Sequence, residues 1–211
     1  MNENIAETEI DLSKMRSSGL YDSYQSFKDL NSQEKTFLLF HSRMVNGVNF
    51  AKNNVYTYSD SKISVLGIPD SQSPRYQTRN DALRHSMLTA LIAKHGGKDY
   101  GSVDKAVDLA IELTDKHEDG DQSAAPAIDH AMDKHNNRVG AEYFRSKGFT
   151  VNINCFLGSC GKDVSGPADD TMAEALFNKG FVKKTTIATI TSQAKTSHVF
   201  LREYSEPVIT N

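Results

Sequence analysis

The chain has 211 residues, enough for one ordinary domain with a real hydrophobic core. Its net charge of −3 is too small to attract nucleic acid or acidic membranes as a whole, so the sequence gives no clear nucleic-acid signal. The longest apolar run, residues 36–40, is far too short to span a bilayer. The acidic start lacks the features of a signal peptide, so we expect a protein that is either secreted without a cleaved signal peptide or cytoplasmic.

The first third of the chain predicts a polar arm followed by short helices. Residues 1–30 are polar, and Asn31 with Glu34 is typical of a helix start. Apolar residues at helical spacing predict a helix to about residue 44 and a second one over residues 48–58. Glycine, proline and serine over residues 59–78 predict a loop, with one short strand at 63–66.

Three longer helices are predicted in the centre of the chain. The first begins at Asn80 and is stopped by the glycine pair 96–97. The second follows Ser102 and runs to about residue 118. The third begins after Pro126 and is closed by Gly148. These three helices carry the candidate site.

The C-terminal part has a different pattern. Residues 150–156 alternate like a strand, 169–178 predict a short helix, and 181–191 and 198–204 predict two strands. We therefore expect a mainly α fold: an N-terminal arm (1–30), a helical core domain (31–148), and an α+β appendage packed on it (149–211). Cys155 and Cys160 are the only cysteines, and the sequence leaves open whether they form a disulfide or remain reduced thiols.

Imidazole, carboxylate and amide groups lie beside the apolar stripes of the three central helices. Burial of such groups is costly unless they bond one another, a metal or a substrate. We predict catalytic roles for five residues: His85, His117, Glu118, Asp133 and His135. Substrate-binding roles are predicted for Arg84, Asn136 and Asn137. Gly140 would allow another helix or a ligand to approach the backbone closely.

Two chemistries fit these residue types. The first is a divalent metal such as zinc or manganese, with candidate ligands His85, His117, Glu118 and Asp133. The second is general acid–base catalysis by a histidine–carboxylate pair. Nine carboxylates against two lysines between residues 104 and 133 favour the cation. A buried network that only holds the three helices together is the structural alternative.

The same residues carry a resemblance to a known group of proteins. They read Ala-Leu-Arg-His at 82–85, His-Glu at 117–118, and Met-Asp-Lys-His-Asn-Asn-Arg-Val-Gly at 132–140. From about residue 31 to 144 the chain resembles a bacterial domain family of unknown function, found in secreted or toxin-like proteins. Leu83 stands where that family usually has an aromatic residue.

The resemblance and the residues together suggest a function. We expect a bacterial exported effector or toxin-like protein that hydrolyses an ester, phosphodiester or cell-envelope substrate, with a cognate immunity or secretion-apparatus protein as partner. The alternative is a non-catalytic helical binding module whose His/Asp/Asn network is structural.

Overall fold

The computed structural model describes residues 30–64, 79–120, 127–156, 159–180, 182–183 and 208–209. The predicted arm, most of the predicted loop, and nearly all of the two predicted C-terminal strands lie outside these residues. Within them the fold is mainly α-helical with a small antiparallel sheet near the C-terminus, as predicted.

The helices are α3 (Ser32–Phe40), α4 (Val45–Ser64), α5 (Arg79–Leu91), α6 (Val103–Gly120), α7 (Ala127–Lys147) and α8 (Asp169–Phe177). Three short turns join them: η1 (Ser42–Met44), the π-helical turn η2 (Ile92–Gly96) and η3 (Lys98–Tyr100). The strands are β1 (Phe149–Phe156), β2 (Ser159–Ser165), β3 (Val182–Lys183) and β4 (Val208–Ile209). None of these described helices is long and apolar enough to cross a membrane.

Helix α3 begins where the sequence predicts, because Asn31 and Glu34 form a capping box. The Asn31 side chain accepts hydrogen bonds from the backbone N–H groups of Gln33 and Glu34, and Glu34 accepts one from the Asn31 backbone at 2.8 Å. The Asn31 amide also donates to the carbonyl of Lys116 at 3.0 Å. The cap therefore ties α3 to the end of α6.

Helix α4 is longer than the pattern predicts, and the loop prediction is wrong for residues 59–64. The chain stays helical to Ser64 because the end of α4 is held against α8. Tyr58 donates a hydrogen bond to Asp169, and Lys62 forms an ion pair with Glu174. Tertiary contacts thus outweigh the polar, serine-rich composition of this stretch.

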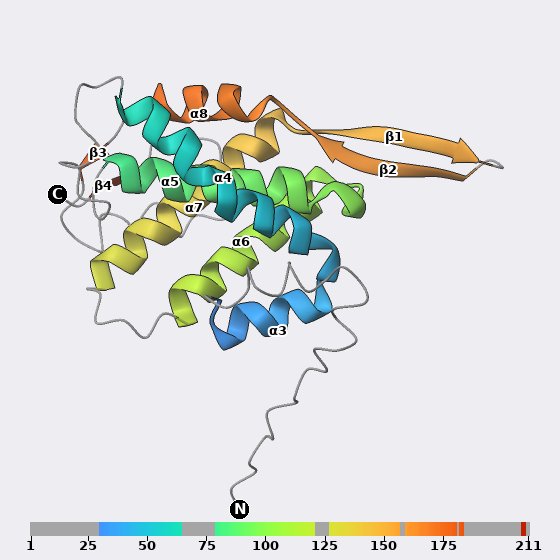
Figure 1. The fold of residues 1–211 in the computed structure, drawn as a ribbon, viewed down its shortest axis with the longest axis horizontal. Coiled ribbons are helices and arrows are strands. Elements are labelled where there is room, and N and C mark those ends of the chain that lie inside the picture. Colours follow the sequence, from blue (N-terminus) through green and yellow to red (C-terminus); the bar gives the residue numbers. More distant parts are fainter. Residues whose placement is uncertain are drawn as a thin grey trace, which may run out of the picture.

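Helix α5 lies in the middle of the molecule, with α4 and α8 against one side and α6 and α7 against another (Figure 1). Most of its residues are buried. It crosses α7 very closely: a Cβ added to Gly140 would lie 1.7 Å from the carbonyl oxygen of Ser86. The predicted role of Gly140 in a close helix contact is confirmed, and this contact fixes the position of α7 beside the start of α5.

The far end of α5 is fixed by Asp169, the first residue of α8. Lys94 Nζ lies 2.7 Å from Asp169 Oδ1, and His95 Nε2 lies 3.1 Å from Oδ2. Burial alone would raise the pKa of Asp169, but hydrogen bonds from His95 and Lys94 hold it at about 2. The carboxylate is therefore ionised and anchors α8 to the C-terminal end of α5.

Strands β1 and β2 form an antiparallel hairpin that extends away from the helices (Figure 1). The sequence predicts the first strand but not the second, because the glycine and polar residues of 159–165 do not alternate clearly. The backbone register places Cys155 opposite Cys160. Strands β3 and β4 pair in parallel.

Candidate functional site

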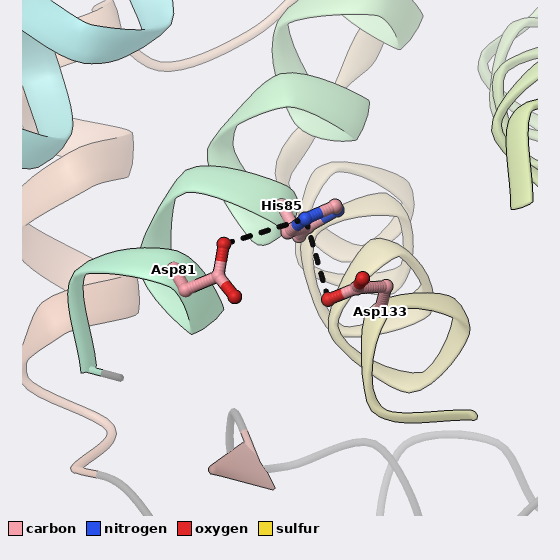
Figure 2. A group of neighbouring side chains, drawn as sticks. All are labelled: Asp81, His85 and Asp133. Carbon is pink, nitrogen blue, oxygen red and sulfur yellow. Dashed lines mark ion pairs between the residues drawn. The ribbon is translucent and has the colours of Figure 1, made fainter. Parts of the chain in front are cut away.

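The candidate site is centred on the imidazole of His85, which is buried near the start of α5. Its Nε2 atom lies 3.6 Å from Asp81 Oδ1 and 3.3 Å from Asp133 Oδ1 (Figure 2). One ligand atom from each of the three residues lies within 4.8 Å of the others. This Asp81–His85–Asp133 group could hold a metal ion.

Helix geometry explains why the three side chains converge. Asp81 and His85 are four residues apart on α5 and therefore share a face. Asp133 comes from α7 and lies seven residues before Gly140, so it is on the helix face that crosses α5. The close crossing at Gly140 and Ser86 therefore brings Asp133 to the imidazole.

Arg84 sets the tautomer of His85. Its guanidinium forms an ion pair with Asp81, and its Nη2 atom lies 3.0 Å from His85 Nε2. A guanidinium has only donors, so Nε2 must accept, and the ring proton is on Nδ1. Burial alone would lower the pKa of Arg84, but the carboxylate of Asp81 raises it instead, so the guanidinium remains charged.

Glu118 lies against the opposite side of the imidazole. Its Oε1 atom is 3.8 Å from His85 Nδ1, and its Oε2 atom is 3.4 Å from Nδ1 of His130. Glu118 is buried, whereas His130 is partly exposed. The carboxylate thus bridges a buried imidazole and one near the surface.

Two of these residues, Asp81 and His130, are not among the site residues predicted from the sequence. Asp81 nevertheless completes the Asp81–His85–Asp133 group. His130 lies three residues before Asp133 and seven before Asn137, and this spacing could have identified it as a member of the same face.

The buried carboxyl groups of the site outnumber its positively charged groups, and this imbalance affects the ionisation of Asp133. Burial and the nearby Glu118 and Asp81 raise the pKa of Asp133 to about 9, although Arg84 opposes the shift. Burial, together with the charge of Arg84, lowers the pKa of His85 well below its usual value. At neutral pH the metal-free site therefore contains a neutral imidazole and a protonated Asp133.

The other predicted residues occupy different positions around this centre. His117 is half-exposed, and its Nδ1 atom lies 3.1 Å from Glu34 of α3. The Asn136 backbone carbonyl accepts a hydrogen bond from Ser86, and the Asn137 side chain accepts one from Thr89, both at 3.0 Å. His135 is buried on α7. The Asp81–His85–Asp133 group contains none of these residues.

A pocket of about 260 Å³ opens beside His85, on the side of Glu118. Its lining includes Arg84, His85, Glu118 and Asn137 but neither Asp81 nor Asp133. His85 therefore separates the metal-competent group from a space where a ligand fits.

Comparison with known proteins gives a family for the chain. Residues 35–156 match the DUF6973 domain of unknown function, which covers more than half of the chain, so the protein belongs to that family. No curated protein and no solved structure matches it.

Proposed function

We propose that this member of the DUF6973 family is a metal-dependent hydrolase with its catalytic centre around His85. The observation that carries the proposal is the convergence of Asp81, His85 and Asp133, with a pocket of about 260 Å³ on the other side of His85. Buried carboxylates converging on an imidazole are costly unless a cation or protons compensate them.

The donor set favours zinc or manganese. Imidazole nitrogen and carboxylate oxygen are ordinary ligands for both ions. Three protein ligands leave positions open for water or substrate, which is typical of catalytic sites. The raised pKa of Asp133 fits as well, because an ion would take the place of the proton that this carboxyl binds in the metal-free protein.

Each chain residue then has a defined task. Asp81, His85 and Asp133 would hold the ion, and a bound ion would supply Lewis-acid chemistry on the Nε2 side of the ring. Glu118 lines the pocket on the Nδ1 side of the ring, away from the three ligands, and would accept a proton from an attacking water in the pocket. The Oε1 atom of Glu118 lies 3.8 Å from His85 Nδ1, beyond hydrogen-bond distance, so its charge rather than a hydrogen bond would orient the ring.

Thermal melting with added metal tests this proposal. We expect zinc or manganese to raise the melting temperature of the wild-type protein and EDTA to reverse the effect, because an ion binds only the folded site. Asp133→Asn should abolish the response. Asp119→Asn is the matched control, since Asp119 is largely exposed and pairs with Lys134. Identical melting with metal and with EDTA would contradict the proposal.

The biological setting is a separate proposal: a bacterial exported effector or toxin-like protein, secreted without a cleaved signal peptide, with an immunity or secretion-apparatus partner. The resemblance of the three motifs to toxin-associated domains supports it. Expression in the cytoplasm and in the periplasm of a bacterial host tests it, with Asp133→Asn as the inactive control. Equal growth for empty vector, wild type and variant in both compartments would refute the toxin role.

The competing function is a non-catalytic binding module. Two hydrogen bonds favour it, because Ser86 and Thr89 of α5 bond Asn136 and Asn137 of α7 as a structural clamp would. On this view Asp133→Asn should destabilise the fold, as a broken buried network does. The hydrolase proposal predicts a folded variant that has lost metal binding.

A further inference from the structure

The pocket beside His85 has an apolar wall and a polar end. The polar end is formed by side chains of α5, α6 and α7, with His85 and Glu118 in its lining. The wall is formed by side chains from α4, α5 and α6, together with Leu30 before α3 and Ile92 in η2: Val48, Val55, Tyr56, Leu88 and Leu113 complete it. Such a cavity matches a ligand with a polar group at one end of an apolar chain.

The lining of the pocket carries no excess of positive charge. Lys52 and Arg84 are the basic residues, and Glu34 and Glu118 the acidic ones. Arg84 already forms an ion pair with Asp81, so its charge is compensated before any ligand arrives. A phosphate group would place its negative charge next to the carboxylate of Glu118, which repels it. The positive charge of Arg84 would not offset this repulsion, because Asp81 already compensates it. The polar end therefore suits an uncharged group such as an ester or amide carbonyl.

The volume of the pocket limits the length of the apolar chain that a ligand can place in it. At about 260 Å³ the pocket is slightly below the usual range for small-molecule sites, roughly 300–1,000 Å³. A larger hollow of about 480 Å³ between α3 and α6 is lined by Phe37, Phe40 and Lys116 and includes none of the His85 group. The smaller pocket alone adjoins the imidazole among the pockets described.

We propose that this pocket binds the acyl chain of an uncharged carboxylic ester or amide, with the carbonyl group beside His85 and Glu118. The assignment rests on the proposed hydrolase function for its chemistry, whereas the ligand class rests on the pocket itself. In the reaction, the oxygen of water bonds to the carbonyl carbon and the bond to the leaving oxygen or nitrogen breaks. Glu118 takes a proton from the water and returns it to the leaving group, which gives a carboxylic acid and an alcohol or amine.

Binding of octanamide, an uncharged acyl amide, tests the ligand class by calorimetry and by NMR of labelled methyl groups. We expect ligand-induced shifts at the methyl groups of Val48, Leu88 and Ile92 but not at Leu39, which is 70 % exposed on α3. Leu88→Trp should weaken binding by at least about tenfold because the larger ring fills the cavity, whereas Leu39→Trp should not change it. The methyl shifts of the wild-type protein decide the question even if Leu88→Trp fails to fold.

Two further measurements distinguish the ligand class proposed here from the proposed metal site. Asp133→Asn should retain octanamide binding, since Asp133 does not line the pocket. If metal binding fails while octanamide binds as expected, the hydrolase proposal falls and the ligand class stands. Tighter binding of octyl phosphate than of octanamide, or octanamide shifts at Leu39 rather than at the pocket methyl groups, would overturn the ligand class.

Discussion

At the scale of single residues, the site is defined by what lies on each side of one imidazole. Asp81 and Asp133 face Nε2 of His85, and Glu118 faces Nδ1. A metal at Nε2 and a proton on Nδ1 are compatible, because the tautomer that Arg84 imposes puts the lone pair on Nε2 and the proton on Nδ1. Arg84 must give up its contact with Nε2 when an ion binds, but it can keep its ion pair with Asp81.

Glu118 is expected to control metal affinity without binding the ion, by orienting the ring of His85. Partners of this kind typically change metal affinity by about 10–100-fold when mutated. Glu118→Gln should therefore weaken zinc or manganese binding within that range in a competition assay. Glu112→Gln, on the same helix but with about half of its side chain exposed, is the matched control and should leave affinity unchanged. Equal affinity for both variants would exclude the orienting role.

Asp133 makes the stability of the metal-free protein depend on pH. Its pKa is raised from 3.8 to about 9, so between these values the folded state binds a proton that the unfolded state has lost. Stability must then fall as pH rises through this window. Asparagine needs no proton, so Asp133→Asn should melt at a higher temperature than wild type in EDTA at neutral pH.

The gain from Asp133→Asn should disappear as the pH falls below 3.8, where both states of the wild-type protein bind the proton. Melting curves in EDTA across this pH range measure the effect, with Asp119→Asn as the exposed control. A lower melting temperature for Asp133→Asn at neutral pH would instead favour the structural clamp.

At the scale of helices, the crossing of α5 and α7 positions the site. A methyl group on Gly140 would overlap the carbonyl of Ser86, and a backbone atom cannot move aside as a flexible side chain can. Gly140→Ala should therefore cost about 3 kcal/mol or more in the free energy of unfolding and weaken metal binding. Gly96→Ala is the control, because its added methyl would meet Met44 at an ordinary 3.4 Å. Denaturant unfolding of both variants measures the difference, and equal costs would contradict this account.

The register of the β1–β2 hairpin bears on whether Cys155 and Cys160 form a disulfide. Cys155 and Cys160 are register partners across the antiparallel pair, and opposed residues have Cα atoms about 4.5–5.5 Å apart. Disulfides span Cα separations of about 4.4–6.8 Å, so the backbone permits the bond. We expect a disulfide when the protein is made in an oxidising compartment. Thiol counting on denatured protein from the periplasm and the cytosol checks this, and two free thiols in both would refute it.

The sequence predicted the positions of the helices more accurately than their lengths. Amphipathic stripes and glycine stops located the central helices because these signals are local. The end of α4 was missed because Tyr58 and Lys62 extend it through contacts with α8, more than a hundred residues away. Likewise, the stripe identified His85 and Asp133 as candidates, but only the crossing of α5 and α7 shows that Asp81 joins them.

At the scale of the whole molecule, α5 connects the site to a rigid frame. Its first turns carry Asp81 and His85, and the residues after its end bond Asp169 at the start of α8. Helices α4, α6 and α7 surround it (Figure 1). A site built on a helix fixed at both ends is preorganised, which suits a metal centre that must keep its ligands close together before the ion arrives.

Calorimetric titration of metal-free protein with zinc or manganese, repeated in buffers of different ionisation enthalpy, tests the central claim most directly. Because Asp133 is protonated at neutral pH, an ion that binds it must displace that proton. We predict saturable binding of one ion per chain with release of about one proton, and loss of both signals in Asp133→Asn. Binding that is equally strong in Asp133→Asn, or no binding by the wild-type protein, would contradict a metal centre at Asp81, His85 and Asp133.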